Sequence, residues 1–463
     1  MSQQLTIGQL MKLWSEASDP IAFLESMRLQ CDPEQLAMLI ATELGDKEID
    51  RVLDLMISID ERKPKWSRRE VRTLGIYYPR FFNGGVEKFL SLIIPIYIRM
   101  GYRVIFFTDI IDEQFEYAFR DTHTQGASML TRIVFKSSPN DLFNRLSELA
   151  FYVRQYKIDL FCSHTVTKIL PTVLLFKFLN VPIVLELHGI FTGYVASTHE
   201  FLQPIERNWK IFRLADGLVV LSRVFERFWK NLGCNAYYIP NPLPPEGFGF
   251  RRDPSVNRKT ILWVGRIVEA KGVREIIPIM REVIRRVPNA KLRVLGAVGD
   301  PYLFEELKSE IKAARLKKCI EFCGYQLDVR QFYATADVML TTSPAEGFSF
   351  TIAESKLFAL PMVCYELPYL ELLRNGGGYI SVRQGDASTA ASAIAEILSN
   401  DELRMQMSTA ARKSIEPFIG HDFAGDWKRV FDDASNGRRA TDMNFEASQI
   451  ELLLMQEIWK LLR

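Results

Sequence analysis

Short runs of β-branched and aromatic residues alternate with helical segments through most of this chain, and this alternation limits the possible folds more than any other feature. A first block of such runs extends from Thr73 to Pro240, and a second block extends from Thr260 to Val382. Strands that alternate with helices form parallel sheets covered by helices on both faces. The sequence therefore predicts an α/β protein built on two parallel sheets.

A segment rich in proline, glycine and charge, residues 242–259, separates the two blocks. A chain of 463 residues is also too long for one compact core. We therefore expect two Rossmann-like domains that face a central cleft. The expected parts are a helical N-terminal extension (1–70), an N-terminal Rossmann-like domain (71–245), a linker (246–258), a C-terminal Rossmann-like domain (259–420), and a C-terminal crossover with amphipathic helices (421–463).

The two ends of the chain show helical spacing but no recognisable chemistry. Helices are expected at residues 5–17, 22–31 and 32–44, the last opening with Asp32 as a cap. The basic stretch from Lys63 to Arg72 is interpreted as a solvated linker, with contact to an anionic membrane as the alternative. The amphipathic tail, residues 447–463, is expected to pack on the protein itself; a partner helix or a membrane is the alternative.

The composition excludes some classes of protein. A net charge of +2 argues against a nucleic-acid binder that works by bulk electrostatics. The N-terminus lacks the basic start and apolar stretch of a signal peptide, and the longest apolar run, Phe89–Ile98, is too short to span a bilayer. We expect a cytoplasmic protein, with peripheral contact at the inner face of the plasma membrane as the alternative.

The first strand of the second block ends in a turn that carries two cations between two glycines. Gly265 allows close backbone approach, and Arg266 and Lys271 place positive charge at the strand end. A diphosphate needs such charges, also when it becomes a leaving group. The pattern favours phosphate binding over a plain solvated turn.

A later strand of the second block leads into PAEGFSFTIAESKLFALP, the strongest group of candidates. Glu346 lies at the strand end, Gly347 opens the backbone, and residues 351–359 are expected to form a helix. Backbone amides at the start of that helix would cradle a phosphate, and they belong to Phe348, Ser349, Phe350 and Thr351. Glu354, one turn into the helix, could accept hydrogen bonds from ribose hydroxyls.

Two strand ends of the first block carry further candidates. Asn83, Gly84 and Gly85 precede a helix, where free amides could bind an anion or a polar acceptor; a plain strand-to-helix turn is the alternative. His188 ends a strand before Gly189, and we interpret it as a functional residue rather than an interior histidine bonded to a backbone carbonyl. His164 is a weaker candidate of the same kind.

The sequence predicts no metal and no cofactor. No Asp-x-Asp stands at a strand end, and no His/Cys cluster has metal-ligand spacing along the chain. The closest cysteines, Cys319 and Cys323, are expected to be core thiols. There is also no Gly-x-x-x-x-Gly-Lys loop.

Taken together, the motifs GRIVEAKG, EGFSFTIAE and NGGVE resemble the retaining glycosyltransferases of the GT-B fold, family 4 (glycosyl transferases group 1). The segments LADGLVVLSR and IPNPL are also similar, and the resemblance covers roughly residues 72–435. It implies an acceptor domain in the N-terminal half and a nucleotide-sugar domain in the C-terminal half. The implied activity is that of a metal-independent hexosyltransferase in polysaccharide, glycolipid or glycoconjugate synthesis, with a UDP- or GDP-sugar as donor.

The resemblance also implies a role for individual residues. Arg266 and Lys271 would bind the donor diphosphate, Glu354 the ribose, and Glu346 the transferred sugar, and the backbone near Tyr325 would border the base. The implied catalytic set is Glu346, His188, Arg266 and Lys271. The implied donor-binding set adds Gly85, Gly265, Tyr325, Gly347, Phe348, Ser349, Phe350 and Glu354, and the acceptor-binding set is Asn83, Gly84 and His188.

The chain departs from the family pattern in two places. The helix after Glu354 is bulkier than usual, with Ala359 where glycine is common, and ELPYLELL replaces the usual Gly-Gly turn, which affects the expected shape of the donor-sugar pocket. One alternative is therefore a non-catalytic GT-B partner that binds an acceptor or stabilises a true transferase. Another is a different GT-B enzyme, such as an epimerase or a phosphorylase.

Overall fold

The computed structural model describes residues 31–62, 70–81, 84–110, 119, 129–165, 169–189, 209–249, 258–374 and 376–440. The helices expected before residue 31, the tail after residue 440, Asn83, and most of the basic stretch before Arg72 lie outside these residues.

The first domain is built on a seven-stranded parallel sheet in the order β3-β2-β1-β4-β5-β6-β7. Leu74 of β1 pairs with Val104 of β2 on one side and with Leu160 of β4 on the other, so the strand order reverses beside β1. The strands are β1 (Thr73–Tyr77), β2 (Arg103–Thr108), β3 (Leu130–Val134), β4 (Leu160–Ser163), β5 (Ile183–Leu187), β6 (Gly217–Val220) and β7 (Ala236–Tyr238).

The second domain is built on a six-stranded parallel sheet in the order β10-β9-β8-β11-β12-β13. Here the order reverses beside β8, which pairs with β9 and β11. The strands are β8 (Thr260–Val264), β9 (Lys291–Leu295), β10 (Ile320–Gly324), β11 (Val338–Thr341), β12 (Met362–Tyr365) and β13 (Tyr379–Val382). All the strand runs expected from the sequence are present, and the prediction of an α/β fold with two parallel sheets is confirmed.

Helices connect the strands, and several of them begin at a side chain that accepts a hydrogen bond from the first turn. Asp141, Ser222 and Asp300 cap α8, α12 and α14 in this way. The helices of the first domain are α5 (Gly85–Arg99), α8 (Leu142–Tyr156), α9 (Ile169–Leu179) and α12 (Arg223–Asn231). Those of the second are α13 (Ile276–Arg286), α14 (Pro301–Ala313), α15 (Arg330–Thr335), α16 (Phe350–Leu357), α17 (Glu371–Arg374), α18 (Ala387–Ser399) and α19 (Asp401–Ile419), with short 3₁₀ turns at Pro245–Gly247, Glu269–Lys271 and Val273–Glu275.

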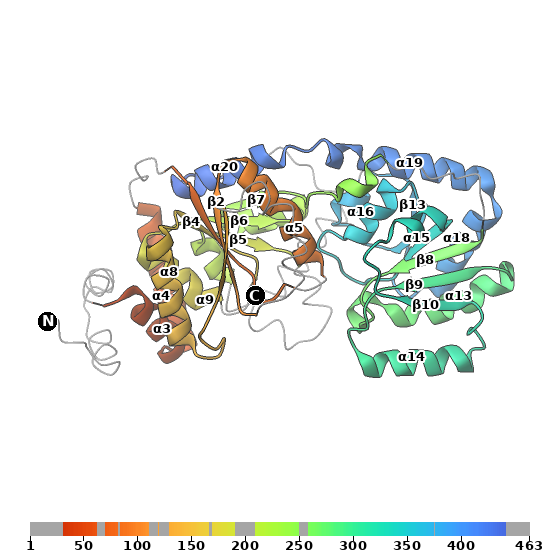
Figure 1. Ribbon diagram of the computed structural model, residues 1–463, viewed down its shortest axis with the longest axis horizontal. Helices are drawn as coiled ribbons and strands as arrows, with labels where there is room; N and C mark the ends of the chain where they lie inside the picture. The colour runs from red at the N-terminus through yellow and green to blue at the C-terminus, as the bar shows by residue number, and fades with distance from the viewer. Residues whose placement is uncertain are drawn as a thin grey trace.

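The described part of the N-terminal extension forms two helices, α3 (Pro33–Glu43) and α4 (Asp46–Arg62), which lie on the outer side of the first domain (Figure 1). Buried side chains such as Ala37 and Val52 belong to the same core as the sheet. Lys177 of α9 bonds Asp60 of α4 at 2.6 Å. Asp32 occupies the predicted cap position of α3, but its side chain makes no capping hydrogen bond.

The last described helix, α20 (Phe423–Ser435), returns to the first domain after α19 has covered the second (Figure 1). Trp427 and Phe431 are fully buried and pack against Tyr97 of α5 at ring distances of 5.5 and 5.3 Å. The chain therefore crosses between the domains twice, once after β7 and once before α20. The two domains are therefore linked by two segments of the chain.

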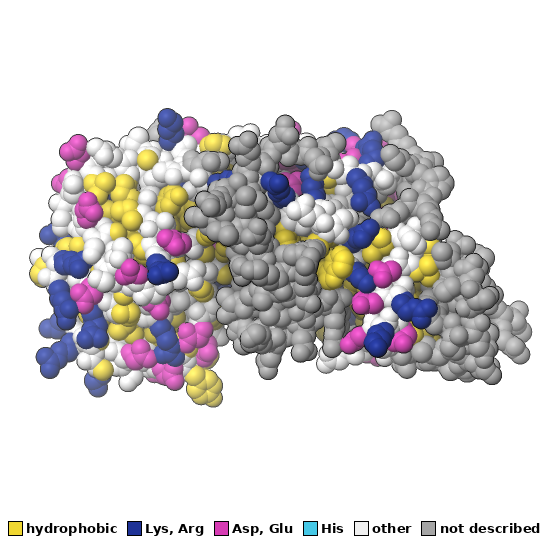
Figure 2. Space-filling view, turned by 180° about the vertical axis from the view of Figure 1, so that it is seen from behind, with side chains coloured by type: hydrophobic (Ala, Val, Ile, Leu, Met, Phe, Trp, Pro, Cys, Tyr) yellow, Lys and Arg dark blue, Asp and Glu magenta, His cyan; other side chains and the backbone are white. Residues whose placement is uncertain are grey.

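Charged side chains of both signs occur on the rear surface of the second domain, at the left of Figure 2. Among the described residues, no helix is both long enough and apolar enough to cross a membrane. The apolar run Phe89–Ile98 lies within α5, where Phe89, Ile93 and Tyr97 are buried in the protein core.

Candidate functional site

The topology brings the predicted motifs together at the carboxyl ends of the strands where each sheet reverses its order. Gly84 and Gly85 follow β1, and His164 follows β4. Gly265 follows β8, and the loop that contains Glu346 follows β11. Ligands of open parallel sheets bind at such points. The carboxyl edges of the two sheets also face each other, because several residues that follow these strands contact the other domain.

Lys271 and Glu346 form an ion pair in the second domain, with Lys271 Nζ 2.7 Å from Glu346 Oε1. The backbone around the pair is tightly packed. Thr342 Oγ1 accepts a hydrogen bond from Trp263 Nε1 at 2.9 Å and donates one to the Lys271 carbonyl at 3.1 Å. Gly272 has φ +62°, and a Cβ there would lie 2.1 Å from the Thr342 carbonyl oxygen. The cation is therefore fixed at the strand end, as the sequence predicts.

Arg266 is exposed, and its charge acts on the first domain. Burial raises the pKa of the Tyr78 hydroxyl, the Glu87 carboxylate raises it further, and the Arg266 guanidinium partly opposes both effects. Tyr78 follows β1, and Glu87 lies in the first turn of α5. The charge of Arg266 therefore lies within electrostatic range of Tyr78 in the first domain.

The loop before α16 contacts the first domain through its backbone. A Cβ on Gly347 would lie 2.1 Å from the carbonyl oxygen of His188, so only glycine fits at this distance. A Cβ on Gly85 would lie 3.9 Å from the ring of Phe350, the first residue of α16. Ser349 has φ 65° and ψ 87°, a left-handed conformation that is costly for any residue except glycine. The amide-bearing start of α16 therefore faces the glycine loop at the start of α5.

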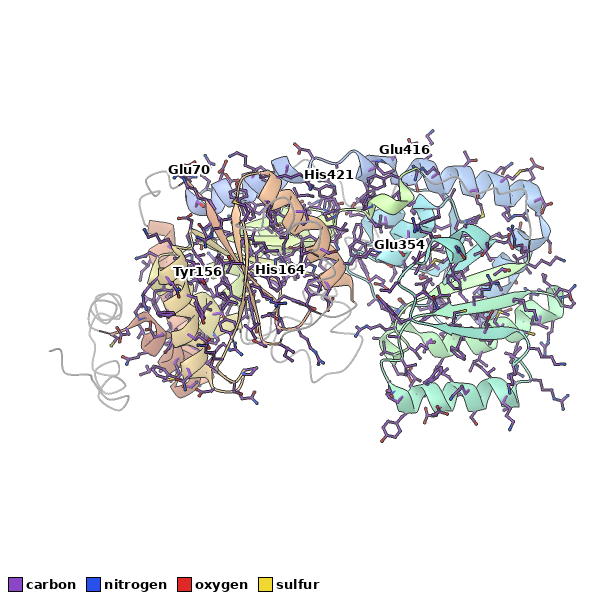
Figure 3. All side chains as sticks on the ribbon, viewed as in Figure 1. Glu70, Tyr156, His164, Glu354, Glu416 and His421 are labelled. Atoms are coloured by element: carbon purple, nitrogen blue, oxygen red, sulfur yellow. The ribbon has the colours of Figure 1, made fainter. Side chains whose placement is uncertain are left out.

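Glu354 is buried, 5% exposed, and its carboxylate is bound from both domains. The Tyr333 hydroxyl donates to Oε2 at 2.7 Å, and the ammonium of Lys88, from α5 of the first domain, bonds Oε1. Figure 3 places Glu354 on the side of the second domain that faces the first. Lys88 and Tyr333 were not predicted from the sequence. The signal for Lys88 was its position directly after the Gly-Gly loop, in NGGVEK.

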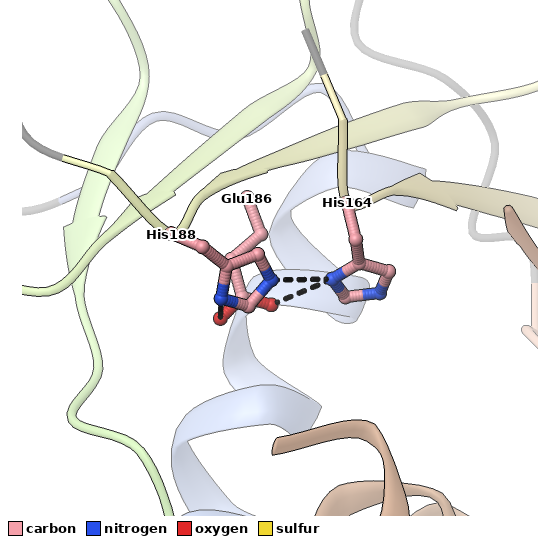
Figure 4. A group of neighbouring side chains, drawn as sticks. All are labelled: His164, Glu186 and His188. Carbon is pink, nitrogen blue, oxygen red and sulfur yellow. Dashed lines mark hydrogen bonds and ion pairs between the residues drawn. The ribbon is translucent and has the colours of Figure 1, made fainter. Parts of the chain in front are cut away.

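His164, Glu186 and His188 form a buried group at the carboxyl ends of β4 and β5 (Figure 4). His164 Nδ1 lies 3.1 Å from His188 Nε2 and 3.2 Å from Glu186 Oε2. His188 Nδ1 lies 3.8 Å from Glu186 Oε1. Both ring nitrogens of His188 therefore face this group, and it is the backbone carbonyl of His188 that contacts the loop of the second domain.

These distances suit one arrangement of protons. An ionised Glu186 requires that His164 Nδ1 carry a hydrogen, which His188 Nε2 then accepts, leaving the proton of His188 on Nδ1. Burial, and secondarily the charge of His164, holds the pKa of His188 well below its usual range, so the ring is neutral at neutral pH. Burial raises the pKa of Glu186, while the hydrogen bond from His164 lowers it.

The same group is also a possible metal-ligand set, because ligand atoms of the three residues lie within 4.8 Å of one another. Two imidazoles and a carboxylate suit Zn²⁺ and similar transition metals. The prediction that no metal is needed rested on spacing along the chain, which cannot detect ligands supplied by two neighbouring strands. The His164–His188 hydrogen bond and the ion-pair contacts of Glu186 also join the three side chains, but among the described residues both Glu186 oxygens and His164 Nε2 have no hydrogen-bond partner.

The remaining predicted residues take different positions. Phe348 is buried and packs edge-on against Phe350 at 5.4 Å. Gly265 lies against the backbone of Gly296. A Cβ added to Gly296 would lie 1.8 Å from the Gly265 carbonyl oxygen. Tyr325 follows β10, at the edge of the second sheet, and is 46% exposed.

Comparison with known families identifies the family to which the chain belongs. The model of Glycosyltransferase Family 4 matches residues 83–246, and the model of Glycosyl transferases group 1 matches residues 250–414. The chain belongs to the family 4 type glycosyltransferases of the GT-B fold. The first model covers α5 and the strands β2 to β7 of the first sheet. The second model covers nearly all of the second domain.

Similar glycosyltransferases come from several bacteria. An uncharacterised glycosyltransferase of Haemophilus influenzae is 22% identical over 46% of this chain and 61% of its own length. The amylovoran biosynthesis glycosyltransferase AmsD of Erwinia amylovora is 24% identical over 44% of this chain and 59% of its own length. The chain therefore spans about three-fifths of the length of these two curated relatives.

Among solved structures, HepE from Anabaena in complex with UDP and glucose has a TM-score of 0.63 to this glycosyltransferase. It is 17% identical and covers 78% of this chain and 97% of its own. At this identity the likeness shows the fold, and it agrees with the two parallel sheets described above.

Proposed function

We propose that this protein transfers a sugar from a nucleoside-diphosphate sugar to a hydroxyl group of a glycan, glycolipid or glycoconjugate, with retention of configuration. The observation that carries the proposal is the meeting of two sets of groups at the domain interface. The second domain supplies Arg266, the Lys271–Glu346 pair and the start of α16, and the first supplies the Gly84–Gly85 loop. Family membership and the sugar-nucleotide complex of HepE support the same assignment.

In this proposal the donor lies across the second domain. Arg266, Lys271 and the amides at the start of α16 bind its diphosphate, since cations and helix N-termini both attract anions. Glu354 accepts hydrogen bonds from the ribose hydroxyls, and Glu346 and the backbone of Gly347 hold the sugar. A diphosphate beside Lys271 also replaces Glu346 as its anionic partner, which frees Glu346 for the sugar hydroxyls.

The reaction breaks the bond between the anomeric carbon and the diphosphate oxygen, and the acceptor oxygen bonds that carbon from the same face. The acceptor proton passes to the departing diphosphate, which gains negative charge as it leaves. Arg266, Lys271 and the helix N-terminus stabilise that charge in the transition state. His188 is not assigned as a base here, because both its ring nitrogens face His164 and Glu186.

The acceptor class follows from the relatives. AmsD is named for amylovoran biosynthesis, and a surface polysaccharide or its lipid-linked precursor is therefore proposed as acceptor. The non-catalytic alternative is less favoured because Arg266, Lys271, Glu346 and Glu354 are all present in the sequence. An epimerase would act on the sugar nucleotide without any acceptor, which distinguishes it directly.

The test begins with thermal shift of the wild-type protein in UDP, GDP, ADP, dTDP, CDP and their common sugar conjugates. The nucleotide that stabilises it then identifies the donor for a turnover assay with an acceptor. Arg266→Ala should lower kcat about 100-fold, because loss of one charge-stabilising donor costs roughly 3 kcal/mol. Arg281→Ala, an exposed cation on α13, is the matched control and should keep wild-type turnover. Wild-type kcat in Arg266→Ala would contradict the proposed role of this residue.

A further inference from the structure

The carboxylate of Glu354 is shared between the two domains. Tyr333 and Lys88 each bind one of its oxygens, and Lys88 reaches it from the first turn of α5. The side chain of Glu354 is 7% exposed, so a charge at this depth requires partners. The ammonium of Lys88 supplies the countercharge.

The two partners differ in their freedom to move. Tyr333 is fully buried and stacks on Phe358 with ring centroids 5.2 Å apart. Burial and the neighbouring Glu354 raise the pKa of its hydroxyl well above the usual value, so it remains a hydrogen-bond donor. The Lys88 side chain is 35% exposed and has a flexible four-carbon stem. Lys88 can therefore leave Glu354 without disturbing the core, whereas Tyr333 cannot.

A ribose that approaches Glu354 meets Lys88 first. The oxygen on the Tyr333 side lies against the core, so a ribose hydroxyl would bind the other oxygen, where it competes with the ammonium of Lys88. The ammonium also lies 5.5 Å from the ring centroid of Phe350, the residue that begins α16. A displaced Lys88 thus stays beside the helix N-terminus to which the diphosphate is assigned above.

We propose that Lys88 is a donor-binding residue supplied by the N-terminal domain, which pairs with Glu354 and exchanges this carboxylate for the diphosphate when ribose takes its place. The inference rests on the proposed function, because it assumes a nucleotide at Glu354. It adds a charged side chain of the N-terminal domain to the donor-binding set, which already includes Gly85 from that domain. It also links recognition of the ribose to the charge around the leaving group.

The exchange predicts opposite effects on two ligands that share a base. A nucleoside displaces Lys88 but offers it no anion, so Lys88 opposes nucleoside binding. A nucleoside diphosphate offers the anion, so Lys88 favours its binding. Lys88→Met should therefore lower the Kd of the nucleoside severalfold and raise the Kd of the diphosphate about tenfold, the size expected for a charge-assisted hydrogen bond. Lys88→Arg should restore much of the diphosphate affinity.

The experiment is calorimetric titration of the full-length protein with uridine and UDP, and with guanosine and GDP. Arg99→Met is the control, because it removes an exposed cation from the last turn of the same helix and should change neither Kd. Urea unfolding of each variant confirms that the compared proteins are folded. The inference is supported if Lys88→Met changes the two affinities in opposite directions.

Other outcomes overturn it in distinguishable ways. If both ligands bind Lys88→Met more tightly, Lys88 only blocks the site and does not bind the diphosphate. If neither affinity changes, Lys88 has no part in donor binding, while the proposed function stands. If the wild-type protein binds none of the four ligands, and no other nucleotide stabilises it, the proposed function fails and this inference with it.

Discussion

Two residues that flank α16 hold a backbone conformation that favours glycine. Ser349 precedes the helix with φ 65°, and Ala359 follows it with φ 52°. At Ser349 this conformation turns the chain so that the loop that begins at Gly347 contacts the first domain. The backbone strain at Ser349 thus serves the contact between the domains. Ala359 lies at the other end of the helix, where it makes no hydrogen bond or ion pair to the first domain among the described residues. A substitution at Ala359 can therefore remove this backbone strain.

The substitution Ala359→Gly is expected to stabilise the protein by about 0.5–1 kcal/mol, because glycine adopts positive φ without the clash that alanine suffers. Part of the gain is offset by the greater freedom of glycine in the unfolded chain. Urea unfolding measures the change. Ala313→Gly, at the exposed helical end of α14, is the control and should lower stability by a similar amount. An Ala359→Gly protein no more stable than wild type would show that this strain is absent in solution.

Single residues of the candidate site differ in how far the sequence could reveal them. Lys271 and Glu346 each follow a strand that the sequence identifies, so their approach to 2.7 Å follows from the parallel sheet. Lys88 and Glu354 lie in different domains, and no spacing along the chain predicts their contact. Glu186 alternates with apolar residues in β5, as polar residues of an ordinary strand do. Its role becomes visible only when the neighbouring strand β4 places His164 beside it.

At the scale of the element, α16 shows how the chain accommodates its departure from the family pattern. Lys356 is 1% exposed and directs its ammonium to the Gly377 carbonyl at 3.1 Å and to Ser414 Oγ at 2.6 Å. A Cβ on Gly376 would lie 2.6 Å from that ammonium, so the glycines before β13 leave room for it. The bulky Lys356 of α16 is thus accommodated by the glycines before β13. The sequence showed both features but not their connection.

Burial of Lys356 makes stability depend on pH. Burial lowers the pKa of its ammonium from 10.5 to about 8. Between these values the unfolded chain keeps a proton that the folded chain has lost, so the stability of wild type rises with pH in this window. From pH 7.5 to 9.5 the gain relative to Lys356→Met should be about 2 kcal/mol. Urea unfolding of both proteins at the two pH values measures it, and titrations common to both cancel. Parallel pH profiles would contradict the lowered pKa.

Strands were more predictable than the packing of helices. Each β-branched run forms a strand, and alternation with helices makes the sheets parallel, although it does not determine the order of the strands. By contrast, α20 leaves the second domain and packs Trp427 against Tyr97 of the first, a long-range contact with no local signal. The cap at Asp32 was also predicted in position but not in bonding. Local patterns therefore predict elements, and contacts distant in sequence decide how the elements meet.

In the whole molecule, the two domains meet on both sides of the candidate site. Ser222 Oγ donates to the Tyr369 carbonyl at 2.7 Å, and the amide of Arg223 donates to Glu371 at 2.8 Å. Gly347 lies against the His188 carbonyl, and Lys88 bonds Glu354. The proposed donor residues Gly347 and Glu354 thus take part in contacts between the domains. Activity should depend on how closely the domains approach.

Gly347→Ala tests this dependence, because the added Cβ would lie 2.1 Å from the His188 carbonyl oxygen. The clash is between domains, so each domain should fold normally and separate slightly from the other. We expect turnover to fall at least tenfold, as misplacement by about 1 Å can cost about 100-fold, and the radius of gyration from small-angle scattering to rise. Gly249→Ala, where an added Cβ has no neighbour within 4 Å, should match wild type in both measurements. Unchanged turnover and scattering in Gly347→Ala would mean that catalysis does not require this approach of the domains.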